Sequence, residues 1–298
     1  MQNDQKKWIY LIILSVVWGS SYILIKKSLE GFSPFQLGAI RIIFSTTFLF
    51  AIGFNSLKTI TRAQWPWVAL SALCGTFLPV FLFSFAETQI DSSIVSILNS
   101  LVPLFTILIG YFAFRLRFTG LQFTGVLLGL AGAALLIFNG ASVNPNQNYW
   151  FAGLVVFAAL CYGANANIIK AKLQEVSSTA IAVGNFAVMI LPALVLGFFA
   201  GLPEKDFSDD VIFEALLYVA LLSVVGTGIA KILFNRLIQI SSPVFSTSVT
   251  YLIPIVGIFW GVLDGERFTA THGVGALVIL AGVYLVNRSR SKQKKTDS

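Results

Sequence analysis

The sequence predicts an all-α integral membrane protein of ten transmembrane helices, arranged as two inverted repeats of five helices with both chain ends in the cytoplasm. Composition is the first observation behind this prediction. Of the 298 residues, 56% are hydrophobic and only 11% are charged, whereas about a quarter of the residues in a soluble domain are charged. The second observation is a series of ten apolar runs, and the third is an internal repeat. Together with a mean hydropathy of +0.83, this composition excludes a soluble fold.

Ten apolar runs follow one another along the chain. Most hold about twenty residues, and a helix of that length is long enough to cross a hydrocarbon core of roughly 30 Å. No segment shows the period-two alternation of a membrane β-barrel strand. The first run follows Lys6 and Lys7 as in a signal peptide, but it is too long and no small-residue cleavage site ends it. The runs cover residues 8–25, 35–54, 65–85, 94–114, 118–138, 149–169, 180–200, 215–238, 244–263 and 272–287.

The distribution of basic residues predicts the orientation, because Lys and Arg near span ends stay on the cytoplasmic side. With the N-terminus inside, the inner segments carry 15 Lys and Arg residues and the outer segments carry 4, while Arg41 lies within a span. Ten spans then return the C-terminus to the cytoplasm. The basic tail that follows the last span suits an anionic lipid leaflet, which is a simpler partner for it than a nucleic acid.

An internal repeat divides the chain into two halves of five spans. Arg117-Phe-Thr119 recurs 150 residues later as Arg267-Phe-Thr269, and Gly75-Thr76 recurs 151 residues later as Gly226-Thr227. We therefore predict a first repeat over residues 1–140, a second over residues 149–288 and a basic cytoplasmic tail over residues 289–298. Because five is odd, the second half enters the membrane from the opposite side. Inverted repeats are typical of secondary transporters, although a duplication that only enlarges a helical bundle is the alternative.

Several motifs resemble the EamA domain of the drug/metabolite transporter superfamily. They are Trp18-Gly19-Ser20-Ser21, Arg41, Ser242-Pro-Val-Phe through Tyr251-Leu-Ile-Pro254, Gly265-Glu266-Arg267-Phe-Thr269 and Leu280-Ala-Gly282. The resemblance covers nearly the whole chain as two EamA repeats. It implies a ten-helix carrier with a central cavity, and exporters of amino acids and related metabolites are prominent among such proteins. The first half departs from the pattern, because Arg115-Leu-Arg117 replaces the acidic residue that is Glu266 in the second half.

Polar residues inside spans are costly in lipid unless they face other helices or water, so each is a candidate for function. One stripe at intervals of three and four residues consists of Ser92, Ser96, Asn99 and Pro103, and its equivalent in the second half consists of Thr247, Thr250 and Pro254. Each proline disturbs the turn before it and frees carbonyl groups. We therefore predict that Asn99 and Thr250 line a cavity; a packing kink is the alternative.

The repeat also pairs two polar positions near the start of each half. Tyr162 and Asn165 match Trp18 and Ser21, so each half carries an aromatic and a polar residue about one turn apart. Such a pair suits an apolar or aromatic solute with a polar head. Hydrogen bonding that only holds helices together is an equal alternative.

Lys231 is the most informative charge in the sequence. Its apolar run alone places it near the cytoplasmic end of a span, where a lysine can reach the interface. The repeat instead aligns it with Val80, well inside a span, and in one stripe with Thr227. A buried ammonium at that depth would attract a carboxylate or a phosphate. Arg41, by contrast, is expected to be an interface or structural anchor, because the outer surface is within its reach, and the single histidine, His272, is expected to be solvated.

Several missing features narrow the function. No phosphate-binding loop or nucleotide-binding domain occurs, so direct ATP-driven pumping is not expected. The two cysteines lack the spacing of a zinc site, and one histidine argues against an enzyme, so no metal, cofactor or catalytic residue is predicted. The acids near the spans are expected at the outer surface, so no carboxylate deep in a span is available to relay a proton. This favours facilitated diffusion or exchange, although proton coupling through an outer acid stays open. These acids are Glu87, Asp91, Glu214, Asp264 and Glu266.

The sequence therefore predicts a secondary transporter that moves an amino acid or a related zwitterion or organic anion across a bacterial inner membrane by alternating access, with export favoured. Its partners would be this small molecule and the lipid bilayer, without nucleic acid, and it would be a monomer or a homodimer. A nucleotide-sugar or phosphorylated-metabolite exchanger would show a second basic residue beside Lys231, and a non-transporting scaffold or receptor would show a closed apolar interior. The predicted substrate-binding residues are Trp18, Thr76, Asn99, Tyr162, Asn165, Lys231 and Thr250.

Overall fold

The computed structural model describes the backbone of residues 2–114, 120–143 and 146–296, and every regular element within these ranges is helical. The all-α prediction is confirmed for this part of the chain. The α-helices are α1 (Gln2–Ser28), α2 (Pro34–Gly53), α3 (Trp65–Ala72), α4 (Leu78–Ala86), α5 (Ser92–Leu98), α6 (Val102–Phe114), α7 (Gly120–Val143), α8 (Ala152–Lys172), α9 (Ser178–Phe199), α10 (Asp210–Leu221), α11 (Ala230–Ile240), α12 (Pro243–Thr247), α13 (Ile253–Leu263) and α14 (Ala270–Thr296). Short helical segments of other pitch adjoin them: η1 (Phe54–Thr59), η2 (Leu73–Phe77), η3 (Asn99–Leu101), η4 (Tyr149–Phe151), η5 (Leu202–Glu204), η6 (Leu222–Ile229) and η7 (Ser248–Tyr251).

Eight helical segments of the described chain are long and apolar enough to cross a bilayer. They are Gln5–Ser28, Pro34–Thr59, Trp65–Ala86, Ser92–Phe114, Tyr149–Lys172, Ser178–Phe199, Asp210–Ile240 and Pro243–Leu263. The predicted spans at residues 118–138 and 272–287 fall in α7 and α14, and within the described residues their apolar parts are Thr124–Leu135 and Ala270–Gly282. The chain is thus an all-helical membrane protein with eight long apolar segments and two shorter ones.

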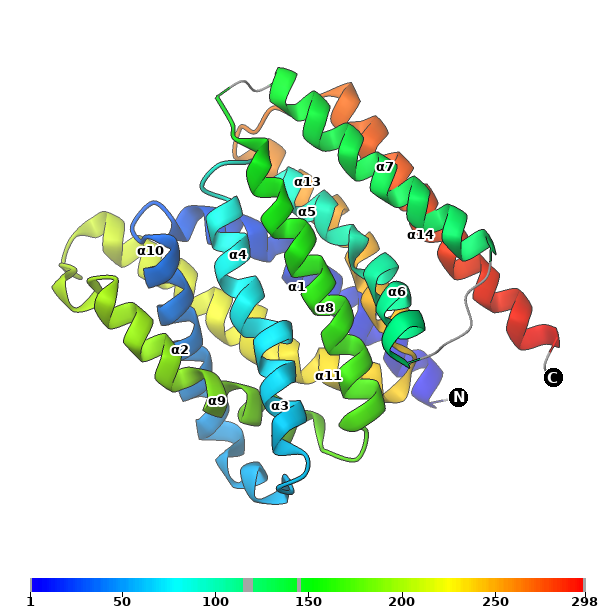
Figure 1. Ribbon diagram of the computed structural model, residues 1–298. Coiled ribbons are helices and arrows are strands. Elements are labelled where there is room, and N and C mark those ends of the chain that lie inside the picture. Colours follow the sequence, from blue (N-terminus) through cyan, green and yellow to red (C-terminus); the bar gives the residue numbers. More distant parts are fainter. Residues whose placement is uncertain (1, 115–119, 144–145, 297–298) are drawn as a thin grey trace.

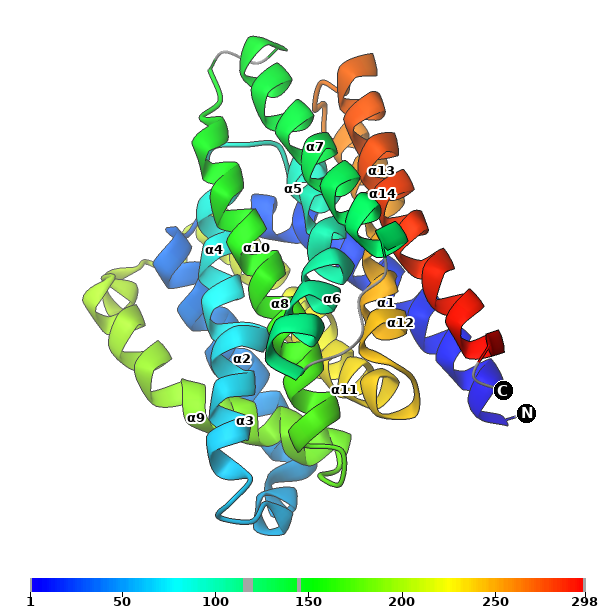
Figure 2. The same ribbon diagram turned by 45° about the vertical axis from the view of Figure 1, so that its right-hand side comes forward.

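Helices at equivalent positions of the two halves pack against each other. In Figures 1 and 2, α7 and α14 run side by side along one edge of the molecule, and α2 packs against α9. The same relation links α1, which packs against α11 and α13, with α8, which packs against α4 and α6. The beginning of α1 and the end of α14 lie at the same end of the molecule (Figures 1 and 2).

Glycines let α7 and α14 approach until their backbones touch. A Cβ atom on Gly282 would lie 2.5 Å from both the carbonyl oxygen of Gly125 and the nitrogen of Gly129. A Cβ atom on Gly132, the residue that the repeat aligns with Gly282, would lie 2.8 Å from the nitrogen of Ile279. Gly125 and Gly129 form the Gly-x-x-x-Gly pattern that permits close helix packing in membranes.

Two pairs of equivalent breaks interrupt the helices around the centre of the molecule. The π-helical segments η2 and η6 contain the repeated Gly75-Thr76 and Gly226-Thr227. The 3-10 turns η3 and η7 lie directly before the helices that begin with Pro103 and Pro254 in their first turn. The predicted disturbance of the turn before each proline is confirmed. Helix breaks of this kind leave backbone groups free for side chains or ligands to bind.

Two features of the sequence lie outside the described residues. Arg115 and Arg117, which replace the acidic residue of the second half, fall within residues 115–119, for which no placement is given. Helix α14 continues through most of the predicted basic tail as far as Thr296, but the side chains from residue 286 onward and all of residues 297–298 are outside the described part.

The packing of α7 on α14 predicts opposite effects for two glycine substitutions in one helix. Gly282→Ala places a methyl group against the backbone of α7, so we expect the free energy of unfolding to fall by about 1–3 kcal/mol. Gly273→Ala is the matched control, because the nearest atom to its new Cβ would be 3.9 Å away, and an alanine inside a helix is otherwise slightly stabilising. Thermal unfolding of the two detergent-solubilised variants measures the difference, and equal stability would contradict the described packing.

Candidate functional site

A cavity of about 80 Å³ lies between the two halves, with room for several water molecules or a small solute. Its walls come from α1, α2, the η2–α4 segment, the η3–α6 segment, α8, the η6–α11 segment and the α12–η7 segment. The helix breaks η2, η3, η6 and η7 all border it. All seven residues predicted to bind substrate lie on its wall: Trp18, Thr76, Asn99, Tyr162, Asn165, Lys231 and Thr250. Their role in binding remains a prediction, but the structure brings them together in one place.

Each π-helical segment offers a glycine carbonyl to a residue of the other half. The Lys231 ammonium donates to the carbonyl oxygen of Gly75 at 2.7 Å, and the Trp18 indole donates to the carbonyl oxygen of Gly226 at 3.0 Å. Gly75 and Gly226 are equivalent in the repeat, so the two acceptors are related by the internal symmetry, whereas the two donors are not. A side chain at Gly75 would collide with Asn165, since a Cβ atom there would lie 2.5 Å from its amide. Glycine at position 75 therefore allows the Asn165 amide to lie against the turn whose carbonyl group binds Lys231.

Three buried polar atoms on the cavity wall make no hydrogen bond within the described chain: Thr76 Oγ1, Asn99 Oδ1 and Asn165 Nδ2. The other atom of the Asn165 amide, Oδ1, accepts a hydrogen bond from the Ser71 hydroxyl at 2.7 Å, which fixes the amide so that Nδ2 is left to donate. A buried polar group without a partner costs on the order of 1–3 kcal/mol. These atoms are therefore suited to bind a polar solute or water in the cavity.

Two cations line the cavity, Lys231 and Arg41. Of the two roles expected for Arg41, an interface anchor or a structural anchor, the interface alternative is wrong, because its side chain is buried and its Nε donates to Thr227 Oγ1 at 2.8 Å. Its remaining guanidinium nitrogens make no hydrogen bond with the described residues. The repeat held the missed signal, since the offset of 144 that aligns Trp18 with Tyr162 also aligns Arg41 with Asn185, in the middle of α9.

Aromatic rings form the apolar part of the wall. Tyr22 meets Phe83 edge-on with ring centroids 5.8 Å apart, and Phe83 stacks on Tyr162 at 5.9 Å. On α1, one turn before Tyr22, Trp18 meets Phe234 of α11 edge-on, with ring centroids 4.9 Å apart. All five rings belong to residues that line the cavity. The site thus combines cationic donors, free polar atoms and an aromatic surface.

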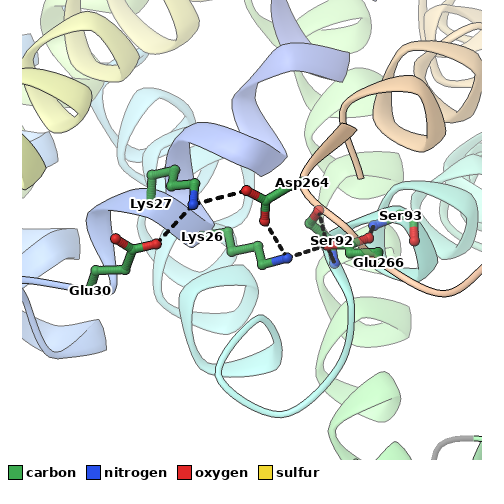
Figure 3. A network of polar contacts seen from close by, with 7 residues as sticks. All are labelled: Lys26, Lys27, Glu30, Ser92, Ser93, Asp264 and Glu266. Carbon is green, nitrogen blue, oxygen red and sulfur yellow. Dashed lines mark hydrogen bonds and ion pairs between the residues drawn. The ribbon is translucent and has the colours of Figure 1, made fainter. Parts of the chain in front are cut away.

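An ion cluster joins residues at span ends that are predicted to face outside, and Figure 3 shows its side chains from close by. It consists of Lys26 and Lys27 on α1, Glu30 just after α1, and Asp264 and Glu266 between α13 and α14. Lys26 Nζ lies 2.6 Å from Asp264 Oδ2 and 2.9 Å from Glu266 Oε1. These ion pairs join the end of α1 to the connection between α13 and α14.

Glu266 is the centre of this ion cluster. Besides the contact with Lys26, Oε1 accepts from the Ser92 nitrogen at 3.0 Å and hydroxyl at 2.7 Å, and Oε2 accepts from the Ser93 nitrogen at 3.0 Å. Burial alone would raise the pKa of Glu266, but the hydrogen bonds from Ser93, Ser92 and Lys26 outweigh it and hold the pKa below its ordinary value. The carboxylate is therefore ionised and anchors the start of α5 to α1.

One residue expected in solvent is buried. The prediction that His272 is solvated is wrong, because the residue is fully buried and its ring lies against Phe268. Two of the acids expected at the outer surface are buried as well, since Glu87 is 9% exposed and the side chain of Glu266 is 2% exposed. Hydropathy places these residues at span ends but does not report how they are packed there.

Comparison with known proteins identifies the family. The model of the EamA-like transporter family matches residues 6–138 and 150–288, nearly the whole chain as two copies. The chain belongs to the EamA-like transporter family. It is an integral membrane transporter rather than an enzyme, so the scaffold alternative and the enzyme alternative are both set aside by family membership.

The relatives of this EamA transporter are distant. It is 25% identical over 304 residues to a "Probable amino-acid metabolite efflux pump" of Escherichia coli (strain K12), with 95% of each chain covered. It is 26% identical to an "Uncharacterized inner membrane transporter" of the same strain over 93% of this chain and 89% of that one. A "Probable terminal-alkyne amino-acid exporter" of Streptantibioticus cattleyicolor is 25% identical over 95% of this chain and 94% of its own. A solved structure with a TM-score of 0.65 and 16% identity, covering 97% of this chain and 99% of that one, shares the fold.

The ion cluster predicts a pH-dependent contribution to stability from Glu266. Because its pKa is lower in the folded state, its contribution is fully present above the ordinary value of about 4.3 and is lost as the pH falls through the folded-state pKa. Glu266→Gln should lower the free energy of unfolding at pH 7 by about 1–3 kcal/mol, since it removes charge-assisted hydrogen bonds, and should flatten stability between about pH 5 and pH 3.

The control for this prediction is Glu30→Gln in the same ion cluster. Glu30 makes an ion pair with Lys27 but its side chain is 57% exposed, and exposed pairs contribute little. Thermal unfolding followed across pH compares the two variants with the unchanged protein. If the stability of Glu266→Gln fell with acidification as steeply as that of the unchanged protein, Glu266 would not be the ionised anchor described above.

Proposed function

We propose that this EamA transporter exports a small metabolite with a carboxylate and an apolar or aromatic group, an amino acid or a related zwitterion or organic anion, across a bacterial inner membrane by alternating access. One observation carries the proposal. The cavity holds two cations, Lys231 and Arg41, while none of the lining residues that the structure describes is acidic. Such a site attracts a negatively charged group such as a carboxylate.

The substrate would use each part of the wall. Its carboxylate would accept hydrogen bonds from Lys231 and the free guanidinium nitrogens of Arg41, because charge-assisted bonds of this kind are the stronger ones. The free donor of Asn165 and the free acceptor of Asn99 would bind the polar head, and the acceptor suits an ammonium. The rings of Tyr22, Phe83 and Tyr162 would cover the apolar group.

The proposal includes ten spans in two inverted halves with both chain ends in the cytoplasm. It is supported by the packing of equivalent helices, α2 on α9 and α7 on α14, and by the position of the two chain ends at the same end of the molecule. In this arrangement α7 and α14 are the fifth and tenth spans. Two halves of opposite orientation can exchange conformations, which opens the cavity to one side and then to the other.

Export into the periplasm is supported by the names of the relatives. An efflux pump and an amino-acid exporter are among them, and another is named as an inner membrane transporter. At 25–26% identity, a shared direction of transport is more plausible than a shared substrate. We therefore take the direction and the membrane from these relatives and the substrate chemistry from the cavity.

A second candidate is favoured by one observation. Arg41 is the second basic residue beside Lys231 that a phosphorylated metabolite or a nucleotide-sugar would require, and a planar guanidinium binds phosphate well. A thermal-stability screen separates the candidates, because a ligand that binds only the native state raises its apparent stability. The panel consists of L-phenylalanine, phenylpyruvate, N-acetylphenylalanine, glucose 6-phosphate and a uridine-diphosphate sugar. Stabilisation by the phosphorylated compounds alone would contradict the carboxylate proposal.

The two cations predict the effect of removing one charge. In proteoliposomes, Lys231→Ala and Lys231→Gln should each lower transport of the stabilising compound by roughly tenfold to a hundredfold, the equivalent of a charged hydrogen bond of about 1.5–3 kcal/mol. The glutamine variant can still donate to the Gly75 carbonyl, so it separates loss of charge from loss of structure. Lys58→Ala, at an exposed position, is the control. Unchanged transport in Lys231→Gln would remove the lysine charge from the site.

A further inference from the structure

Glu87 is a buried carboxylic acid whose role the proposed function does not use. It directly follows α4, which contributes Val80 and Phe83 to the cavity wall, and its backbone nitrogen donates to the Phe83 carbonyl at 2.9 Å. The residue is 9% exposed, and both of its carboxylate oxygens are buried without a hydrogen-bond partner in the described chain. An ionised carboxylate is not stable in such a place, whereas a protonated one is.

The surroundings of Glu87 connect the cavity with the ion cluster. Its charge interacts with Arg41 on the cavity wall and with Lys26 and Glu266 in the ion cluster, and it also acts on the Tyr22 hydroxyl. Helix α8, which packs on α4, adds one titratable ring, Tyr162, stacked on Phe83. The titratable groups that interact electrostatically with Glu87 are thus Tyr22 and Lys26 on α1, Arg41 on α2 and Glu266 before α14.

We propose that Glu87 is the proton-binding site of the transporter, and that one proton carried inward on its carboxyl group is exchanged for each metabolite carried outward. This inference rests on the proposed function. Glu87 takes up a proton while it is open to the outside and becomes buried as the neutral acid. It releases the proton to the cytoplasm, as a carboxylate, when the opposite conformation opens. No other reactant is consumed.

The contrast between two neighbouring acids supports this assignment. Glu266 has four donors around its carboxylate and keeps its charge. Glu87 has none, and burial followed by repulsion from Glu266 raises its pKa well above the ordinary value, although Arg41 and Lys26 act in the opposite direction. When two nearby carboxyl groups have pKa values displaced in opposite directions, the one with the raised pKa is the one suited to hold a proton.

Exchange follows from linkage between the two ligands. An ammonium group bound near Tyr22 and Asn99 places positive charge on the side of the cavity that faces Glu87, which lowers the proton affinity of that carboxyl group. By reciprocity, a proton on Glu87 lowers the affinity for the ammonium. The proton and a zwitterion therefore tend to occupy the carrier in turn, and the inward proton gradient across a bacterial membrane can then drive export.

The protonation of Glu87 can be measured without any substrate. Infrared spectra of the purified full-length protein should show a protonated carboxyl band at neutral pH that disappears in Glu87→Gln and persists in Glu204→Gln, an exposed control. In addition, the raised pKa means that the stability contributed by Glu87 falls as the pH rises above about 4.3. Glu87→Gln resembles the neutral acid, so its melting temperature should exceed that of the unchanged protein at about pH 8. A spectrum without that band, or parallel pH profiles, would overturn the proton site.

Coupling is measured in proteoliposomes with labelled L-phenylalanine and labelled phenylpyruvate. An imposed pH gradient should drive accumulation of L-phenylalanine, and Glu87→Gln should lose this accumulation but keep exchange of labelled for unlabelled compound, while Glu204→Gln keeps both. Gradient-driven accumulation in Glu87→Gln would overturn the coupling. If the unchanged protein exchanges neither compound, the proposed substrate class fails, whereas the infrared result still decides whether Glu87 holds a proton.

Discussion

The structure depends on one constraint, that every backbone N–H and C=O group within a lipid bilayer must find a partner inside the protein. An uninterrupted helix meets this requirement by itself, so a break in a helix is tolerated only where side chains or water can take over. In this transporter the four breaks η2, η3, η6 and η7 surround a single cavity, and two of the carbonyl groups beside them are bound by Lys231 and Trp18 of the opposite half. The breaks therefore create the site and join the two halves at the same time.

The internal symmetry explains the shape of the site but not its charge. Trp18 corresponds to Tyr162, Thr76 to Thr227 and Asn99 to Thr250, so both halves supply similar walls. The cations are not symmetric, because Lys231 aligns with Val80 and Arg41 with Asn185. Arg41 bonds Thr227, and Lys231 lies one helical turn after Thr227. The ion cluster is also asymmetric, because it lies at only one end of the molecule. Symmetric walls suit a carrier with two related conformations, and asymmetric charges let it distinguish the two sides of the membrane.

Much of this arrangement could be predicted from the sequence because it depends on periodic patterns. Hydropathy gave the helical segments, and the repeat brought Lys231 from the apparent surface into the cavity wall together with the other six predicted residues. The residues that sequence reasoning misplaced are those whose surroundings come from distant parts of the chain. Arg41 bonds Thr227, which lies 186 residues away in the chain. Hydropathy reports the depth of a residue in the membrane but not the direction of its side chain, so it could not separate an anchor at the surface from a cation in a cavity.

The central claim is that the cavity opens in turn to each side of the membrane. It is tested most directly by placing a single cysteine at Thr250, on the cavity wall, in a chain whose Cys74 and Cys161 are replaced by alanine, and by labelling it with a membrane-impermeant thiol reagent from either side of oriented vesicles. Alternating access predicts labelling from both sides and protection from both by the compound that stabilises the protein. Labelling from one side only, or from neither, would contradict the account.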